Sequence, residues 1–189
     1  MQNNGIHYRI MEHFSINNLF TNRQLGFLKG RSTVTQLLKI LDDWTEALEI
    51  GGRIDVIYRY MDFEKAFDKV PHRRLMSKLK TYKLHNSIIE WIQNFLSHRK
   101  QRVRIHDEYS CWIEVFSGIP QGSILGPLLF IIFINDLVST CYVNVKLYLF
   151  ADDAIYCHIK DDVDKVHLQK VIDSFVESTD KWEMKLNVN

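Results

Sequence analysis

Hydrophobic residues recur at helical spacing in the first third of the chain, most clearly after residue 32. Thr33 and Gln36 match a capping box, so a helix is predicted to begin there and to run to about Glu49. The pair Gly51–Gly52 would end it. The apolar positions of this segment share one helical face: Val34, Leu37, Leu38, Leu41, Trp44 and Leu48.

The next segments alternate between strand and helix patterns. The stretch from Ile54 to Phe63 is rich in β-branched and aromatic residues, which predicts a strand. Pro71 then begins a helix, and Ser87 with Glu90 forms a second capping box ahead of another helix. The apolar residues of these helices are Leu75, Leu79 and Tyr82 in the first, and Ile88, Ile89, Trp91, Ile92, Phe95 and Leu96 in the second.

The second half of the chain returns to short strands on both sides of one apolar run. Alternation from Gln101 to Phe116 around a polar centre predicts a hairpin. Pro127 stands where a helix would begin, and the apolar run after it predicts a buried helix. Residues 144–150 and 154–159 read as two strands with Asp152–Asp153 at their turn. A last amphipathic helix carries Leu168, Val171, Ile172, Phe175, Val176 and Trp182.

The order of these elements predicts the fold class. Helices and strands are interspersed, and short turns join adjacent strands, which favours an α+β fold with helices packed on one face of a largely antiparallel sheet. The chain has 189 residues, no internal repeat and no Pro- or Ser-rich linker. We therefore expect a single unit, residues 1–189, with a sizeable core.

Composition narrows the class of protein only in part. The 46% hydrophobic and 25% charged residues are typical of an ordinary globular domain. The formal net charge of +1 gives no global sign of a nucleic-acid partner, so only a local basic patch could supply one. The three cysteines are widely spaced, which argues against a disulfide framework or a zinc site and favours a reducing, intracellular compartment.

A stretch without charged residues, Val115 to Asn135, is long enough to suggest a membrane span. Proline and glycine residues between Pro120 and Pro127 interrupt it, and the apolar remainder is too short to cross a bilayer. The first residues do not have the basic-then-apolar pattern of a signal peptide. We therefore expect no membrane partner.

Two acidic sites stand in apolar surroundings, where burial of unpaired charge is costly. Asp62 lies near the end of the strand predicted at 54–63, and Asp152–Asp153 lie at the later turn. If these strands are neighbours, three carboxylates meet, and divalent cations would relieve their repulsion. Oxygen ligands alone favour Mg²⁺ or Mn²⁺, and two such ions suit phosphoryl transfer. A plain turn-capping role stays equally open, because Asp42–Asp43 and Asp161–Asp162 are also acid pairs.

Three segments carry a resemblance to a known family. YMDFEKAFDKVPHRRL at 60–75, SGIPQGSILGPLLFIIFINDL at 117–137 and FADD at 150–153 resemble motifs A, B and C of reverse transcriptases, in the family's order. They are most similar to those of non-LTR, LINE-like retrotransposons. With the fingers motif at residues 24–33, they make four matching motifs in the family's order and spacing, which argues against an accidental match.

The resemblance extends over almost the whole chain. QLGFLKGRST at 24–33 resembles the fingers motif upstream of motif A, and the stretch from Leu168 to the end resembles motif D. This similarity implies a polymerase-type palm at about residues 54–189, plus a partial fingers region at about residues 1–53.

Carried over position by position, the resemblance assigns the acids to catalysis. Asp62 and Asp152 would be the main ligands of two Mg²⁺ or Mn²⁺ ions, and Asp153 would complete the catalytic carboxylate set. The carbonyl oxygen of Phe63 would be a further ligand of the metal held by the incoming triphosphate. Phe67 would be the aromatic steric gate that excludes a 2′-hydroxyl from the dNTP. An ordinary core aromatic is the alternative for Phe67.

The resemblance also assigns residues to the nucleotide and to the template and primer. Gln121 would join Phe63 and Phe67 at the incoming nucleotide, and Gly122 would let the template approach because it lacks a Cβ. A simple turn is the alternative for both. The cations expected to bind phosphates of an RNA template and a DNA primer are Arg31 in the fingers motif and Arg99, Lys100, Arg102 and Arg104 in the predicted hairpin. A solvated outer face is the alternative for the hairpin cluster.

Two departures from the family pattern lie beside the acids. The strand before Asp62 is two residues longer than usual, which preserves the alternation of its faces. The strand after Asp153 is one residue shorter, which would exchange its faces unless the turn absorbs the deletion.

The sequence begins after the N-terminal fingers strands of relatives and ends before their primer grip and thumb. We therefore expect an RNA-directed DNA polymerase core that is a truncated fragment of a retroelement polyprotein. A catalytically inactive or domesticated nucleic-acid-binding domain is the alternative. A third reading is a piece that does not fold stably alone, because missing parts leave apolar surface bare.

Overall fold

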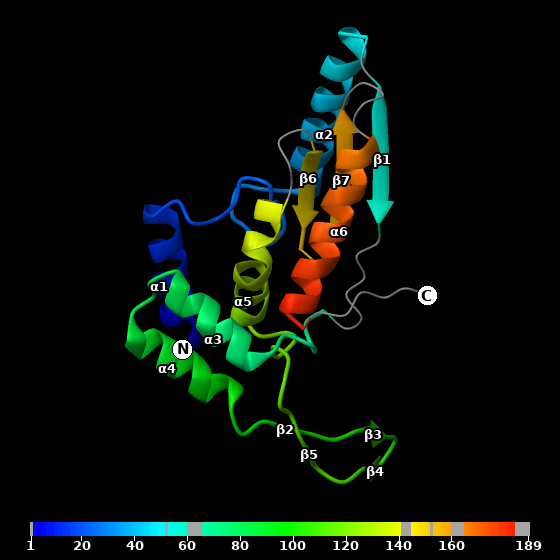
Figure 1. Cartoon of the computed structure of the whole chain (residues 1–189). Coiled ribbons are helices and arrows are strands. Elements are labelled where there is room, and N and C mark those ends of the chain that lie inside the picture. Colours follow the sequence, from blue (N-terminus) through cyan, green and yellow to red (C-terminus); the bar gives the residue numbers. More distant parts are fainter. Residues whose placement is uncertain are drawn as a thin grey trace.

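The computed structural model describes residues 2–51, 53–59, 66–140, 145–151, 153–159 and 165–183. Asp62, Phe63 and Asp152 lie outside this part of the chain, and Asp153 is described by its backbone alone. The described elements form an elongated molecule with a β-sheet at one end and a group of helices at the other (Figure 1). A β-ribbon projects from the end that carries the helices (Figure 1).

A three-stranded antiparallel sheet has the order β1 (Ile54–Arg59), β7 (Asp153–Ile159) and β6 (Val145–Phe150) (Figure 1). β6 and β7 form a hairpin in which Phe150 pairs with Asp153, and β1 pairs with β7 up to Arg59, opposite Ala154. Both pairings run without a bulge through the described strands, so the shorter return strand keeps a regular register. The predicted α+β class with antiparallel sheets is confirmed.

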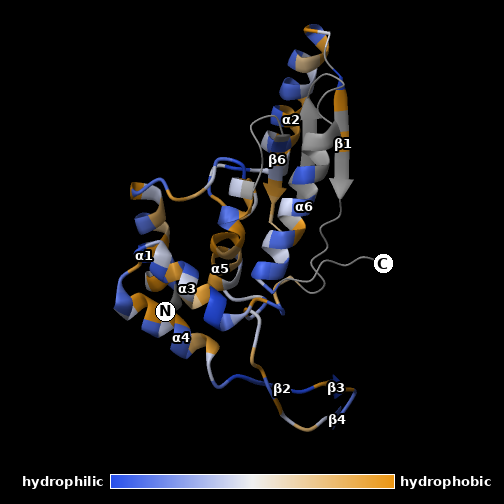
Figure 2. Cartoon of the chain, viewed as in Figure 1, coloured by the Kyte–Doolittle hydropathy of each residue, from blue (hydrophilic) through white to orange (hydrophobic). Residues whose placement is uncertain are grey.

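Helix α5 (Leu125–Ile134) is the centre of the core, as its apolar run predicted. It is hydrophobic along most of its length (Figure 2) and begins two residues before Pro127. Nine of its residues are buried: Leu125, Gly126, Leu128, Leu129, Phe130, Ile131, Ile132, Phe133 and Ile134. Burial on every side explains why no amphipathic pattern marks this helix.

Helices α1 (Gln2–Ile16) and α3 (His72–Thr81) pack against α5, and α4 (Asn86–Leu96) packs against α3. The buried residues that they bring to this core are Ile10 and Phe14 from α1, Leu75 and Leu79 from α3, and Ile88, Ile89, Ile92 and Leu96 from α4. The sequence pattern predicted the apolar faces of α3 and α4 but gave no prediction for α1.

The predicted helix starts need two corrections. In α2 (Thr33–Glu49) the cap is Ser32, whose Oγ accepts a hydrogen bond from the Thr35 amide at 3.1 Å, rather than Thr33. In α4 the cap is His85, whose Nδ1 accepts from the Ser87 amide at 3.3 Å, so the helix begins before the predicted Ser87 box. In both cases a side chain just upstream reaches the free amides of the first turn.

Helix α2 also presents a different face to the protein than its pattern suggested. It packs against β1 and β6, with Gln36, Ile40 and Ala47 buried. Its predicted apolar face is more than half exposed at Val34, Leu37, Leu38, Leu41 and Leu48. Periodicity identifies an apolar face, but it does not say whether the described chain covers that face.

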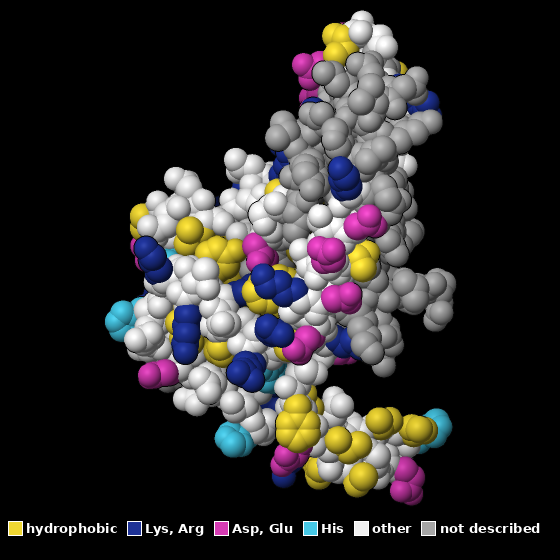
Figure 3. Space-filling view, in the orientation of Figure 1, with side chains coloured by type: hydrophobic (Ala, Val, Ile, Leu, Met, Phe, Trp, Pro, Cys, Tyr) yellow, Lys and Arg dark blue, Asp and Glu magenta, His cyan; other side chains and the backbone are white. Residues whose placement is uncertain are grey.

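The predicted hairpin forms an arm, defined here as residues 99–116. β2 (Lys100–Gln101) pairs with β5 (Ile113–Glu114), and β3 (Arg104–Ile105) pairs with β4 (Glu108–Tyr109). The arm leaves the body of the molecule below α3 and α4 (Figure 1). Hydrophobic side chains gather along it (Figure 3), including Val103, Ile105, Tyr109, Trp112, Ile113 and Phe116, which are exposed.

A buried lysine of α3 contacts the end of α5, the helix that follows it and Trp182. Lys78 is 4% exposed and donates hydrogen bonds to the Phe133 carbonyl and to the carboxylate of Asp136 in the 3-10 helix η1 (Asn135–Thr140). Its Nζ lies 3.8 Å from the centroid of the Trp182 ring, just after α6 (Lys165–Lys181). Burial lowers the pKa of Lys78 to about 8, although Asp136 opposes that shift.

In the part of the chain described here, no helix is both long enough and apolar enough to cross a membrane.

The lowered pKa of Lys78 predicts a stability that rises with pH. Between about pH 8 and pH 10.5 the unfolded chain binds more protons at this residue than the folded chain does. Relative to Lys78→Met, the free energy of unfolding of the unsubstituted chain should therefore increase by on the order of 3 kcal/mol across that window. Urea unfolding of both chains at pH 7 and pH 10.5 measures the change.

Lys80→Met is the matched control, because Lys80 is an exposed lysine on the same helix. Its free energy of unfolding should follow that of the unsubstituted chain at both pH values. A constant difference between the unsubstituted chain and Lys78→Met would contradict the burial of a charged Lys78.

Candidate functional site

The end of β1 and the turn of the β6–β7 hairpin lie at one end of the sheet. Arg59 is the last residue of β1 and pairs with Ala154, one residue into β7. In the sequence, Asp62 follows Arg59 by three positions, and Asp152 falls between the last residue of β6 and the first residue of β7. The strand before Asp62 and the strand after Asp152 are therefore neighbours in the sheet, as predicted. The carboxylates of Asp62 and Asp152 lie outside the described residues.

The second half of motif A is tied to the loop of motif B. Residues 67–70 and the loop at 117–121 are joined by backbone hydrogen bonds, and Pro71 forms a β-bridge with Ser117. The Gly118 amide donates to the Val70 carbonyl at 2.8 Å, and the Ile119 amide donates to the Phe67 carbonyl at 2.7 Å. The position of the 117–121 loop is thus fixed by the segment that leads from Asp62 into α3.

Gly118 makes this junction possible. Its φ of +81° lies in the left-handed region, and a Cβ there would lie 2.6 Å from the Cα of Asp68. The Gly118 carbonyl accepts hydrogen bonds from His72 at 2.8 Å and from Arg99 at 2.5 Å. Burial lowers the pKa of His72, and Arg99 adds to that shift, so the neutral imidazole is favoured at this contact.

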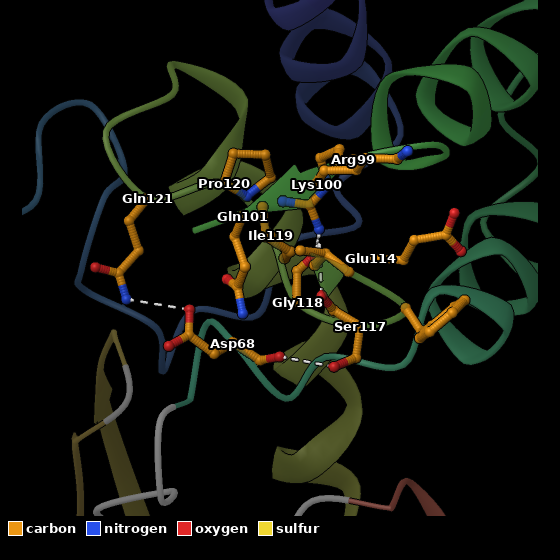
Figure 4. Close-up of a pocket in the computed structure, with 12 residues that line it drawn as sticks. Asp68, Arg99, Lys100, Gln101, Glu114, Ser117, Gly118, Ile119, Pro120 and Gln121 are labelled. Carbon is orange, nitrogen blue, oxygen red and sulfur yellow. Dashed lines mark hydrogen bonds between the residues drawn. The ribbon is translucent and has the colours of Figure 1, made fainter. Parts of the chain in front are cut away.

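A cavity of about 790 Å³ lies between the 117–121 loop and the base of the arm (Figure 4). Gln121, Arg99 and Lys100 all line it, so three predicted site residues meet there. Gln121 donates a hydrogen bond from Nε2 to the Asp68 carboxylate at 3.4 Å. Arg102 and Arg104 lie farther along the arm and do not line the cavity.

Phe67 is half-buried and held by two other rings. It stacks on Phe130 of α5, with ring centroids 4.6 Å apart, and meets Phe27 edge-on at 6.3 Å. The predicted alternatives, a steric gate and a core aromatic, are thus both compatible with its surroundings. Part of the ring packs on the core, and part remains accessible.

The predicted phosphate-binding cations have different surroundings. Arg31 donates to the carbonyls of Thr21, at 2.8 Å, and Gln24, and burial lowers the pKa of its guanidinium. Arg102 instead lies 3.8 Å from the Tyr109 ring and 4.5 Å from the Trp112 ring. Arg31 is therefore engaged within its own loop, whereas Arg102 and Arg104 of the arm lie over aromatic rings.

Several residues of the site were missed by sequence reasoning. Asp68, His72 and Gly118 were quoted only as members of motifs, and Gln24 and Gly26 received no role. All of them act through contacts with backbone that is distant in the sequence. The glycines in SGIPQG and QLGF were the only available signal, because glycine often marks a close backbone approach.

The chemistry of the predicted ligand set fits a hard divalent ion. Asp62, Asp152, Asp153 and the Phe63 carbonyl would offer only oxygen atoms, which Mg²⁺ and Mn²⁺ prefer. Elsewhere in the described ranges, no group of three or more His, Cys, Asp or Glu side chains is placed to hold a metal. The chemistry of these oxygen ligands alone makes the predicted set the candidate metal site.

Comparison with known proteins gives a family for this chain. A family model described as reverse transcriptase (RNA-dependent DNA polymerase) matches residues 3–189. The chain is 28% identical over 187 residues to the probable RNA-directed DNA polymerase from transposon BS of Drosophila melanogaster, covering 91% of this chain and 20% of that protein. It is 27% identical over 196 residues to the RNA-directed DNA polymerase from mobile element jockey of the same species, covering 95% and 21%.

A further relative comes from a different insect. Over 125 residues the chain is 34% identical to the retrovirus-related Pol polyprotein from type-1 retrotransposable element R2 of Nasonia vitripennis, covering 65% of this chain and 11% of that protein. The chain thus spans about a fifth of the length of the first two relatives. The resemblance to non-LTR retrotransposons agrees with these matches.

The close approach at Gly118 predicts a large effect of one methyl group. Gly118→Ala adds a Cβ against the Asp68 backbone and strains the left-handed φ, so it should lower the free energy of unfolding by about 3 kcal/mol. Gly122→Ala is the matched control, with a φ of +76° and open space around its Cβ, and should cost only about 1 kcal/mol. Urea unfolding measures both, and equal losses would refute the close packing.

Proposed function

The chain belongs to the reverse transcriptase family, as its motifs predicted, and we propose that it is the catalytic core of an RNA-directed DNA polymerase. Its reaction would be the addition of a dNTP to the 3′-hydroxyl of a primer. The pairing of β1 with β7 is the observation that carries this proposal, because it brings the chain leading to Asp62 beside the turn that holds Asp152 and Asp153.

Asp62 and Asp152 are proposed as the main metal ligands, with Asp153 completing the carboxylate set and the Phe63 carbonyl as a further ligand. Two Mg²⁺ or Mn²⁺ ions, when bound, would activate the primer hydroxyl and stabilise the pyrophosphate leaving group. The oxygen-only ligand set supports this choice of ion.

The nucleotide is proposed to lie beside Phe67 and Gln121. Stacking on Phe130 fixes the Phe67 ring, which suits a residue that must exclude a 2′-hydroxyl by its position. The hydrogen bond to Asp68 restrains Gln121 at the mouth of the cavity. Gly122, with open space around it, would leave room for the template strand.

The RNA template and DNA primer are proposed to lie against the cations of the cavity and the arm. Arg99 and Lys100 line the cavity, and Arg102 and Arg104 continue the positive charge outward along the arm. Lys and Arg side chains at a surface attract phosphates of any sequence. Arg31 would act less directly, since its described hydrogen bonds hold its own loop.

We further propose a division into a partial fingers region, about residues 1–53, and a palm, about residues 54–189. The matched relatives are about five times longer than the aligned chain, which supports its origin as part of a polyprotein with other modules.

The metal-site proposal predicts that Asp152→Asn abolishes primer extension. Loss of one carboxylate charge should lower the rate on an RNA template with Mg²⁺ by at least about a thousandfold. The same change should remove any rise in melting temperature that Mn²⁺ gives the unsubstituted chain. Asp42→Asn is the matched control, because Asp42 is an exposed member of another acid pair.

Two outcomes would count against this assignment. Equal loss of activity in Asp42→Asn and Asp152→Asn would mean that the effect is not local to the turn. An unsubstituted chain that neither extends a primer nor responds to Mn²⁺, but binds nucleic acid, would favour the inactive or domesticated nucleic-acid-binding domain instead.

The steric-gate proposal predicts a change in sugar selectivity. Phe67→Val should raise the incorporation of rNTPs relative to dNTPs by about tenfold to a hundredfold, because the ring no longer fills the space of the 2′-hydroxyl. Competitive primer extension with both nucleotides gives the ratio. Phe95→Val, at a half-buried phenylalanine of α4 that stacks on Trp91, should leave the ratio unchanged. An unchanged ratio in Phe67→Val would assign that ring to the core alone.

A further inference from the structure

The loop before α2 lies along the free edge of the sheet, next to the acid-bearing turn. β7 occupies one edge of β6, and residues 23–25 pair with the other. The Leu25 amide donates to the Leu149 carbonyl at 2.8 Å, and the Leu149 amide donates to the Arg23 carbonyl at 2.9 Å. This short parallel bridge ends where β6 reaches its turn.

The side chain of Gln24 continues that pairing into the turn itself. Gln24 is 1% exposed, and its Oε1 accepts hydrogen bonds from the amides of Ala151 at 3.1 Å and Gly26 at 2.8 Å. Its Nε2 donates to the Ala151 carbonyl at 3.3 Å. Both polar atoms of this buried amide are therefore satisfied, and they bind both backbone polar groups of one residue.

Ala151 is a position that needs such support. Its φ of +55° is left-handed, a conformation that residues with a Cβ adopt at a cost. It lies directly before Asp152 in the sequence and two positions before the start of β7 at Asp153. A side chain that binds its amide and its carbonyl restrains the path of the backbone on which both acids are carried.

Gly26 closes the contact from the other side. A Cβ at this position would overlap the amide nitrogen of Ala151 and would lie 3.1 Å from the Phe150 carbonyl carbon. Only glycine lets the loop backbone reach the turn this closely. The approach of the loop is thus set by direct backbone packing as well as by the Gln24 hydrogen bonds.

The loop is itself anchored to the core. Arg31 donates to the carbonyls of Thr21 and Gln24, which fixes the loop on both sides of residues 22–23. The Thr21 amide donates to the Asn135 Oδ1 at 2.9 Å, and Asn135 stands at the end of α5. A continuous set of hydrogen bonds therefore leads from the buried helix of motif B to the turn of motif C.

We propose that Gln24 is a positioning residue for the acid-bearing turn, and that it acts on metal binding through Ala151. This inference deepens the proposed function and rests on it, because it takes Asp152 and Asp153 as ligands. Gln24 does not touch the metal or the substrate. It holds the turn so that the two carboxylates are presented in one arrangement before a metal arrives.

Gln24→Met tests the inference, because methionine has a similar length but cannot make these hydrogen bonds. Amide exchange of Ala151 measured by NMR should become about tenfold faster, while the amides of α5 keep their protection. The Kd for Mn²⁺, measured by titration of the metal alone, should rise by about tenfold. Gln36→Met is the matched control, at another buried glutamine on α2, and should change neither quantity.

Gln24→Glu carries the test if Gln24→Met fails to fold. The glutamate keeps an oxygen that can accept from the amides of Ala151 and Gly26, but it replaces the donor to the Ala151 carbonyl with a second oxygen. The Ala151 amide should therefore exchange faster than in the unsubstituted chain, and exchange at the unsubstituted rate would overturn the inference.

Two further results would overturn the inference alone. The first is an unchanged rate of Ala151 amide exchange in Gln24→Met. The second is faster Ala151 exchange in Gln24→Met with an unchanged Kd for Mn²⁺, which would make Gln24 a purely structural contact. If the unsubstituted chain itself fails to bind Mn²⁺, the proposed function fails. If the unsubstituted chain binds Mn²⁺ and Gln24→Met gives one of the two results above, only the inference about Gln24 fails.

Discussion

The antiparallel pairing of β1 with β7 is the constraint on which the proposed site depends. It joins segments about a hundred residues apart, with Ile54 opposite Ile159 and Arg59 opposite Ala154. Because the register is continuous, the end of β1 arrives beside the turn of the β6–β7 hairpin. At this end of the sheet, the loop that carries Gln24 is hydrogen-bonded to the turn. The 117–121 loop is hydrogen-bonded to residues 67–70 of motif A. Motif A is thus held by backbone contacts with motif B, and motif C is held by contacts with the fingers motif.

The part of this arrangement that follows from local pattern was predictable. Alternation indicated the strands at 144–150 and 154–159 and the arm, and the apolar run after Pro127 indicated the central helix. The pattern was less informative at element ends, where Ser32 and His85 cap helices that Thr33 and Ser87 were predicted to begin. It was also silent on α1, whose weak amphipathic pattern hides two core residues.

Contacts between distant segments could not be predicted in this way. Gln24 and Ala151 are 127 positions apart, and nothing around Gln24 in the sequence indicates which backbone its amide will bind. Likewise, Arg31 was assigned to the template because of its motif and charge, but its hydrogen bonds go to nearby carbonyls. A motif gives the residue type at a site, whereas the three-dimensional packing decides what that side chain contacts.

The central claim is that Asp62 and Asp152 share metal ions at this end of the sheet. Anomalous diffraction from crystals of the chain grown with Mn²⁺ tests it most directly, because the metal itself is located. The account predicts manganese peaks at about 2.1 Å from carboxylate oxygens of both residues. A structure in which the two carboxylates point apart, with manganese elsewhere or absent, would contradict it.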